Sequence, residues 1–299
     1  MKEAVIDIGS NSMRLTVYEV EEKKFKILFK EKFMAGLAGY VENGCISEEG
    51  IQRACNGLLE FKNTLKLLSL DECVHVFATA SLRNIVNTDD AVAQIKEKTG
   101  FDLDIISGEE EAVLGYMGVM QEIAVSEGVF VDIGGASTEI TVFKDHELYF
   151  SKSFRIGSLK LYKDCVKKIL PGKGSLKRIE KAIDEALSAD YDSFTKQKQL
   201  VCTGGTARAV LKLAKFLGLV SENERTLLIA HMDKIKEVLL ADEKQAAEVI
   251  LKVVPERIHT IIPGFLILYS IAVEFQVEKI MVCNFGSREG YLCQKVLTT

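Results

Sequence analysis

Two segments of the sequence nearly repeat one another, and both carry residues that can bind phosphate. AVIDIGSNSMRLTVYEV starts at Ala4, and VFVDIGGASTEITVFK starts at Val129, about 125 residues later. Each is a run of β-forming residues that ends in Asp-Ile-Gly, followed by small or hydroxylated residues and a second apolar run. The pattern predicts a strand, a tight turn and a second strand, with a carboxylate just before the turn.

The chemistry of these two turns favours a phosphorylated ligand. Glycine has no side chain, so backbone N–H groups can approach an anion closely, and hydroxyl and amide groups add further donors. Asp7 and Asp132 precede the turns and could hold a hydrated Mg²⁺. The predicted phosphate-binding residues are Gly9, Ser10, Asn11, Ser12, Gly134, Gly135, Ser137 and Thr138. Two such turns predict two similar domains that face each other across a cleft around one metal-bound polyphosphate group.

A third glycine turn lies in VCTGGTARAV, where Gly204 and Gly205 join a predicted strand to a predicted helix. The start of a helix suits an anion or a nucleotide, because its backbone N–H groups are free. An ordinary strand–helix turn with Thr206 as N-cap is the alternative interpretation.

The segment ISGEEEAVLGYMGV carries the candidate catalytic base. Ser107 and Glu110 form the S-x-x-E pattern of a capping box, in which Glu110 reaches back to the helix start. Glu111 shares its face of the helix with Gly115 and Gly118. Each glycine costs roughly 1 kcal/mol relative to alanine in a helix interior, so the pair indicates close approach of the opposite domain or of a substrate. We therefore predict that Glu111 orients and deprotonates an attacking water.

Two arginines follow predicted strands at positions where open α/β sheets bind ligands. Arg83 follows VHVFATASL, and Arg288 follows KIMVCNFGS at the equivalent place in the second domain. One guanidinium from each side of the cleft could clamp phosphoryl oxygens as charge develops on them. A surface ion pair is the alternative for Arg83.

The elements that must position these residues alternate in an α/β order with an antiparallel start. We predict strands at 4–9, 12–20, 24–35, 74–81, 103–107, 129–135, 137–144, 147–156, 199–203 and 279–286. We predict helices at 47–68, 88–98, 107–125, 158–169, 175–188, from 206 onward, at 222–254 and at 261–276. The sequence has only three prolines. A flexible linker is therefore not expected, and the 107–125 helix is the predicted hinge between the domains.

Composition narrows the function classes. The 299 residues are enough for two domains with their own cores, and 47% apolar with 27% charged residues is typical of a soluble globular protein. A net charge of −5 argues against general nucleic-acid binding. The segment 151–181, however, contains ten Lys or Arg residues and only two acidic residues, Asp164 and Glu180. This basic segment is either a solvated helix face or a track for a polyanionic substrate.

Cysteine usage indicates a reducing compartment. The seven cysteines form no C-x-x-C pair, and the four histidines show no zinc-ligand spacing. We expect Cys73, Cys202 and Cys283 to be buried beside strands. No signal peptide is recognised at the start, and 261–275 is too short to span a bilayer, so it is predicted to be a buried helix of a cytoplasmic protein.

Taken together, these motifs resemble the exopolyphosphatase/guanosine pentaphosphate phosphohydrolase (Ppx/GppA) family of the actin, sugar-kinase and heat-shock-chaperone ATPase superfamily. The resemblance runs nearly end to end, through IDIGSNSMRL, ATASLR, ISGEEEA, VDIGGASTE, RIGSLKL, CTGGTARA, ER…IIPG and SREG. It implies two ribonuclease H-like domains facing a central cleft, at 1–120 and 121–287, with helix 288–299 packed back on the first domain. A homodimer is also expected from the resemblance alone.

The resemblance also implies an activity and its residues. The family removes the terminal phosphate of inorganic polyphosphate, of guanosine pentaphosphate, or of both, with Mg²⁺. Its catalytic glutamate matches Glu111, its metal-linked acids match Asp132 and Glu139, and its phosphate-binding arginines match Arg83 and Arg288. The matching phosphate-loop residues are Ser10, Asn11, Gly134, Gly135 and Ser137.

Two departures from the family pattern are visible. Ala136 stands where the family usually has a third glycine, which restricts this turn position to negative φ. The segment FMAGLAGYVENG lacks the arginine that usually precedes its Leu-Gly.

Polyphosphate is the preferred substrate because of the basic segment 151–181, and guanosine pentaphosphate is the close alternative. An ATP-dependent small-molecule kinase of the same superfamily is one rival. A regulator that binds an alarmone or nucleotide without turnover is another. Neither nucleic acid nor a membrane is an expected partner.

Overall fold

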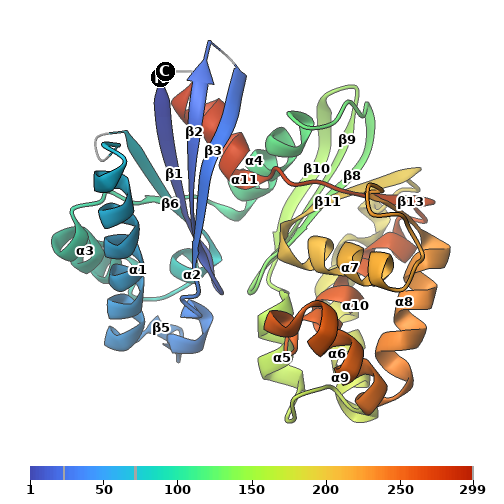
Figure 1. Ribbon diagram of the computed structural model, residues 1–299. Helices are drawn as coiled ribbons and strands as arrows, with labels where there is room; N and C mark the ends of the chain where they lie inside the picture. The colour runs from blue at the N-terminus through green and yellow to red at the C-terminus, as the bar shows by residue number, and fades with distance from the viewer. Residues whose placement is uncertain (23, 71–72, 298–299) are drawn as a thin grey trace.

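The computed structural model describes residues 1–22, 24–70 and 73–297, which form two α/β halves side by side (Figure 1). Among the described residues, the first half has a five-stranded sheet in the order β3-β2-β1-β6-β7. Its strands are β1 Lys2–Ile8, β2 Met13–Glu21, β3 Lys24–Phe33, β6 Val74–Ala78 and β7 Asp104–Ile105. A two-stranded ribbon, β4 Val41–Glu42 with β5 Cys45–Ile46, lies beyond the sheet.

Both faces of the first sheet are covered, which explains why β1 is buried almost throughout rather than alternating. On one face, side chains such as Ile6 and Leu15 pack with Leu58 of α1 (Glu48–Leu67) and Ile95 of α3 (Thr88–Thr99). On the other face, residues of β1, β2 and β6 pack with α4 (Gly108–Met120) and α11 (Ser287–Tyr291). The ring of Phe77 stacks on that of Tyr291 at 4.8 Å.

The second half repeats this topology in a six-stranded sheet, in the order β10-β9-β8-β11-β13-β12 within the described residues. Its strands are β8 Glu127–Ile133, β9 Thr138–Lys144, β10 Glu147–Phe154, β11 Gln199–Thr203, β12 Thr226–Leu228 and β13 Lys279–Val282. Its helices are α5 Ser158–Cys165, α6 Lys173–Leu187, α7 Gly204–Phe216, α8 Ile229–Ala241, α9 Glu243–Val253 and α10 Ile261–Glu274. β8 pairs antiparallel with β9 and parallel with β11, as β1 does with β2 and β6. The predicted duplication of the hairpin is confirmed.

The two halves are joined where α4 crosses α11. A Cβ atom on Gly118 would lie 1.9 Å from the carbonyl oxygen of Gly286, and one on Gly290 would lie 1.9 Å from the carbonyl oxygen of Leu114. One on Gly115 would lie 2.6 Å from the ring of Phe130 in β8. Gly115 therefore serves contact with the opposite half, which is one of the two predicted reasons for these glycines, whereas Gly118 serves contact with α11.

Several predicted element limits are wrong, for local reasons. The 74–81 strand ends at Ala78, and a short helix, α2 (Ala80–Arg83), follows because the Ser81 hydroxyl donates to the Ile8 carbonyl at 3.0 Å. The stretch 222–254, predicted to be filled by helices, also contains β12, an edge strand antiparallel to β13. Its three residues are too few to show alternation, and they run directly into the apolar pattern of α8. α4 ends at Met120 rather than at 125.

The expectations on cysteines and on the apolar helix are largely confirmed. All seven cysteines, each within the described part of the chain, are free thiols. Cys202 and Cys283 are buried, but Cys73 is exposed, since it precedes β6 rather than lying within it. α10 is a buried helix, as predicted. Within residues 1–22, 24–70 and 73–297, no helix is long and apolar enough to cross a membrane.

The α4–α11 crossing leaves no room for a side chain, so we expect Gly118→Ala to lower the free energy of unfolding by about 3 kcal/mol. Gly174→Ala is the matched control, because Gly174 is exposed near the start of α6 and its Cβ would lie 3.7 Å from Arg178 Nη1, an ordinary contact distance. That variant should be neutral or more stable by up to about 1 kcal/mol. Urea unfolding measures both. Equal midpoints for Gly118→Ala and the wild type would contradict the close contact.

Candidate active site between the two sheets

The two phosphate-type turns meet at the centre of the molecule. A Cβ atom on Gly135 would lie 3.4 Å from Cβ of Ser10 and 3.5 Å from Cβ of Asn11. Beside this contact lies a cavity of about 120 Å³, here called the turn cavity. Predicted site residues that line it are Asp7, Gly9, Ser10, Asn11, Ser12, Glu111, Asp132, Gly134, Gly135, Ser137, Gly204 and Gly205. Most of the predicted site is thus brought together from both halves and from α4.

Local backbone structure places each of these groups. Asp7 and Asp132 end β1 and β8, and each faces across its hairpin to the start of the next strand, at Arg14 and at Glu139. Gly204 has a left-handed φ of +87°, and a Cβ there would lie 2.3 Å from a carboxylate oxygen of Asp132. Ala136 is not among the positive-φ residues, as its side chain requires.

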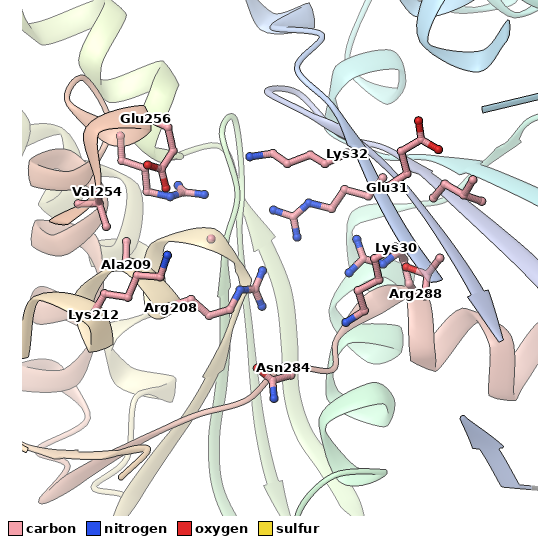
Figure 2. A pocket seen from close by; sticks show the side chains of 15 residues that line it. Lys30, Glu31, Lys32, Arg208, Ala209, Lys212, Val254, Glu256, Asn284 and Arg288 are labelled. Atoms are coloured by element: carbon pink, nitrogen blue, oxygen red, sulfur yellow. The ribbon is translucent and has the colours of Figure 1, made fainter. Parts of the chain in front are cut away.

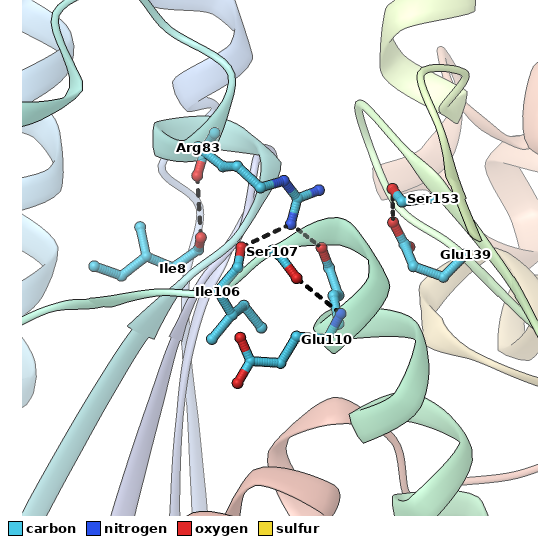
Figure 3. Close-up of polar contacts among 9 residues, drawn as sticks. Ile8, Arg83, Ile106, Ser107, Glu110, Glu139 and Ser153 are labelled. Atoms are coloured by element: carbon cyan, nitrogen blue, oxygen red, sulfur yellow. Dashed lines mark hydrogen bonds and ion pairs between the residues drawn. The ribbon is translucent and has the colours of Figure 1, made fainter. Parts of the chain in front are cut away.

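Glu111 is held at the edge of the turn cavity by Arg83. The Arg83 Nη1 atom donates to Glu111 Oε2 at 2.8 Å and to the Ile106 carbonyl at 3.1 Å (Figure 3). Burial of the carboxylate and the nearby Glu139 raise the pKa of Glu111 well above its usual value, and Arg83 only partly opposes this shift. Arg83 is not part of the cavity lining, so in this structure it positions Glu111 rather than meeting a ligand directly.

Neighbouring Glu110 points elsewhere. Its backbone N–H is capped by the Ser107 hydroxyl at 3.0 Å, as the S-x-x-E pattern predicts. Its carboxylate, however, pairs with Lys295 at 2.6 Å instead of completing a capping box. Lys295 belongs to the C-terminal turn that packs beside α4, which the local pattern could not indicate.

Glu139 and Thr138 lie behind the turn cavity rather than in its wall. The Thr138 hydroxyl donates to the Ile156 carbonyl at 2.7 Å, so it secures β9 and is not available to a phosphate. Glu139 accepts a hydrogen bond from Ser153 at 2.7 Å. Burial of its carboxylate, next to Asp132, raises the pKa of Glu139 to about 7.

Four carboxylates therefore converge on one place: Glu139, which is buried, and Asp7, Asp132 and Glu111, which are half-buried. Burial raises the pKa of Asp7 and of Asp132, although Arg288 and Arg208, respectively, oppose it. Among the described residues, no three acids, histidines or cysteines form a complete metal site. Mg²⁺ does not need one, because it usually takes one or two carboxylates and completes its shell with water and phosphate oxygens. An all-oxygen set of mutually repelling acids fits such a cation.

A second and larger cavity of about 340 Å³, the cationic cavity, opens from the first and shares Arg14, Gly205 and Arg257 with it. Its basic lining comes from both halves of the molecule. Figure 2 shows Lys30, Lys32 and Arg288 on one side and Arg208 and Lys212 on the other. The full basic set among the described lining residues is Arg14, Lys30, Lys32, Arg208, Lys212, Arg257 and Arg288. Its acids are Glu31 and Glu256.

Regular structure arranges these cations in two facing rows. Arg14 lies opposite Lys32 in the β2–β3 pairing, and Thr16 lies opposite Lys30, so the basic side chains share one face. Arg208 and Lys212 are four residues apart on α7 and therefore share a face of that helix. Burial, with Arg288 and Arg208 nearby, lowers the pKa of Arg14 to about 10. The two rows repel each other and leave a positive field that an anion would neutralise.

The position of Arg288 corrects one prediction. It lies on α11 beside β1, with Nη1 3.7 Å from Asp7 Oδ2, and so belongs to the same side of the cleft as Arg83. The expected clamp of Arg83 and Arg288 from opposite sides is wrong. The reason is that the chain crosses back to the first sheet after β13, where Tyr18 binds Glu289 at 2.8 Å.

Sequence reasoning missed most of the cationic cavity. Arg14 stands in the first hairpin motif, and Arg208 follows Gly204–Gly205 closely. Both positions could therefore have been predicted from the sequence as part of the site. Arg257 stands in the ER…IIPG motif of the family resemblance, and its guanidinium lies against Gly205, where a Cβ atom would be 1.9 Å away. Lys30 and Lys32 carry no sequence signal, because alternating lysines are common on edge strands.

Two facing phosphate turns, an acid cluster and a cationic cavity define a phosphate-handling protein of the actin-like ATPase fold. Residues 16–299 match the profile of the Ppx/GppA phosphatase family, and the chain belongs to that family. It is 27% identical to the guanosine-5′-triphosphate,3′-diphosphate pyrophosphatase of Vibrio atlanticus over 297 residues, which cover 98% of this chain. For the same enzyme of Vibrio vulnificus the identity is 28% over 295 residues and 96% of this chain. The chain spans 59% and 58% of the lengths of these two relatives.

Solved structures confirm the predicted fold class. An exopolyphosphatase from Cytophaga hutchinsonii superposes with a TM-score of 0.87 at 22% identity, over 100% of this chain and 98% of that one. The Ppx/GppA family member from Aquifex aeolicus gives a TM-score of 0.81 at 24% identity, with the same coverage. The limits of the two predicted domains, at 120 and 287, stay a prediction.

The raised pKa of Glu139 predicts how stability depends on pH in the metal-free protein. Between its ordinary value of 4.5 and about 7, the folded state binds more protons than the unfolded state. Stability in EDTA should therefore fall as pH rises through this window, and Glu139→Gln should flatten the fall. Exposed Glu147 of β10 provides the control variant Glu147→Gln. Thermal unfolding at pH 4.5 to 7.5 measures how the melting temperature depends on pH. An equal decrease for the wild type and Glu139→Gln would contradict the burial of this charge.

Proposed function

We propose that the protein hydrolyses the terminal phosphoanhydride of inorganic polyphosphate. The observation that carries this proposal is the cationic cavity, which continues directly from the turn cavity through Arg14 and Arg257. Seven basic residues among its described lining face only two acids, and none of that lining is aromatic. A repeating anion without a base to stack fits this lining best, because each phosphate can meet a separate cation.

Guanosine pentaphosphate is the second candidate, and the curated relatives favour it. Its phosphates could bind the same cations, and Glu31 or Glu256 would be the acids near its nucleoside.

The homodimer expected from the family resemblance also stays a prediction.

In the proposed reaction, the turns hold the terminal phosphate and Glu111 accepts a proton from the attacking water. A carboxylate whose pKa is raised by burial is a stronger base than an exposed one, which suits this step near neutral pH. The ion pair with Arg83 fixes its direction. The water attacks the terminal phosphorus in line, and the shortened chain leaves with the bridging oxygen.

Asp7 and Asp132 line the turn cavity and would hold Mg²⁺, with Glu139 behind them, and the cation when bound would neutralise the non-bridging oxygens of the terminal phosphate. Arg14 and Arg257 lie between the two cavities and would stabilise charge on the departing chain. The rest of the substrate would lie between the two cationic rows. Its negative charge would attract both rows and so draw the two halves of the molecule together.

We expect Glu111→Gln to reduce phosphate release by about a thousandfold, since the amide cannot accept the proton. Glu110→Gln is the matched control: it is the preceding residue of the same helix, but its carboxylate faces Lys295 outside the turn cavity. Phosphate release with Mg²⁺ is measured from long-chain polyphosphate and guanosine pentaphosphate in parallel.

The wild-type result decides between the candidates. Faster release from polyphosphate supports the first, and faster release from guanosine pentaphosphate supports the second. Binding of guanosine tetraphosphate without any turnover would contradict the hydrolase and indicate a regulator. Transfer of phosphate from ATP to a small molecule would indicate a kinase.

Neutralising one row of the cationic cavity should weaken substrate binding more than catalysis. We expect Lys212→Gln to raise KM for polyphosphate by about tenfold with little change in kcat, because it removes a cation from the distant part of the substrate. Lys215→Gln is the control on the same helix, since Lys215 lies outside the cationic cavity and binds the Glu222 carbonyl. An equal KM for the wild type and Lys212→Gln would show that the substrate does not occupy this cavity.

A further inference from the structure

A third cavity of about 350 Å³ lies on the other flank of the turn cavity. It shares Ser10 with the turn cavity and has no lining residue in common with the cationic cavity, as described. The turn cavity therefore borders both of the others, and Ser10, which contacts Gly135, belongs to the wall between the turn cavity and the third cavity. We call the third one the flank cavity.

The basic segment 151–181 supplies the charge of the flank cavity. Of its ten basic residues, Arg155, Lys160 and Lys163 line this space. Others are engaged elsewhere, as in the ion pair of Lys152 with Asp190 at 2.7 Å. The sequence left open whether this segment is a solvated helix face or a binding surface for a polyanion. In the structure, only these three of its basic residues line the flank cavity.

The flank cavity has hydrogen-bond donors that could bind a small oxyanion. No hydrogen bond or ion pair within the described residues engages the Arg155 guanidinium, and Lys163 Nζ donates to an uncharged acceptor, the Ala38 carbonyl, at 2.7 Å. Lys160 is neutralised by Asp164 at 2.6 Å. Ser10 and Asn84 add a hydroxyl and an amide to the lining. Guanidinium, ammonium and neutral donors together suit a phosphate ion.

The flank cavity is also connected to the first phosphate turn. The backbone N–H of Ala38 donates to the Ser10 carbonyl at 2.9 Å, and that of Gly36 donates to the Asn11 carbonyl at 2.9 Å. Lys163 of the second half thus holds the segment that supports the turn of the first half. An anion arriving beside Lys163 would compete with the Ala38 carbonyl for its ammonium group, because a charged acceptor makes the stronger hydrogen bond.

We propose that the flank cavity is a binding site for orthophosphate, through which this product leaves while the shortened chain stays in the cationic cavity. The proposal rests on the proposed hydrolase function. After each cleavage the freed phosphate lies at the turns, and the remaining polyanion occupies the path toward Arg14 and Arg257. The flank cavity, with three cations and one acid among its described lining, attracts a small anion less strongly than the cationic cavity attracts a long one. The chain can then advance without dissociating.

The experiment measures orthophosphate binding to full-length Glu111→Gln, with and without saturating polyphosphate, by isothermal titration calorimetry. If the flank cavity is the site, orthophosphate binds in both cases, and Arg155→Gln or Lys163→Gln in that background weakens its binding by about tenfold. Polyphosphate affinity should not change in Arg155→Gln, because Arg155 lies outside the lining of the turn and cationic cavities. Lys167→Gln, an exposed lysine of the same basic segment outside the cavity, should leave both affinities unchanged.

Two results would overturn the proposal. Orthophosphate displaced competitively by polyphosphate would place it in the cavities already described, and unchanged binding in both Arg155→Gln and Lys163→Gln would exclude this lining. Because binding is measured without turnover, these outcomes are independent of whether the wild-type protein hydrolyses polyphosphate.

Discussion

The backbone contact between α4 and α11 is the constraint on which the site depends. Gly118 and Gly290 let the two helices approach until a carbonyl oxygen occupies the place of a side chain. α4 carries Glu111 at its first turn, and α11 carries Arg288 at its own start. One crossing therefore sets the position of the candidate base, of an arginine beside Asp7, and of both sheets. Such a junction transmits any relative movement of the halves directly to the reacting groups.

Around this junction most acids and most bases of the site gather in separate places, and the pairs Arg83–Glu111 and Arg288–Asp7 join them only in part. The carboxylates of Asp7, Asp132, Glu111 and Glu139 gather at the turns, while the arginines and lysines gather one cavity further on. Each set is costly to bury by itself, because like charges repel and water is partly excluded. A divalent cation with a polyphosphate group carries the complementary pair of charges. The arrangement is thus best explained by a ligand that stabilises both sets at once, and the stability lost at the site is compensated by the two apolar cores.

Two adjacent residues show how far tertiary contacts decide chemistry. Glu110 and Glu111 have the same side chain and lie on the same helical turn. Glu110 pairs with Lys295 near the end of the chain, and Glu111 pairs with Arg83, the last residue of α2. One becomes part of the packing of the C-terminal turn, and the other lines the turn cavity with its pKa raised. The capping pattern around Ser107 is the same for both and distinguishes neither.

The sequence by itself determined the duplicated hairpins, the α/β order, most elements to within a few residues, and the turn residues that meet at the centre. These follow from short-range causes: β-forming runs, glycine at turns and capping at helix starts, each readable from neighbouring residues. Glu111 was also identified, because Gly115 and Gly118 on its helix face signal a close contact. Only the tertiary structure decided which cations face the ligand. Arg14, Lys32, Arg208 and Arg257 come from β2, β3, α7 and the turn after α9, and no spacing in the chain relates them. Local pattern placed Arg288 on the second side of the cleft, whereas α11 packs on the first sheet, which only the family resemblance implied.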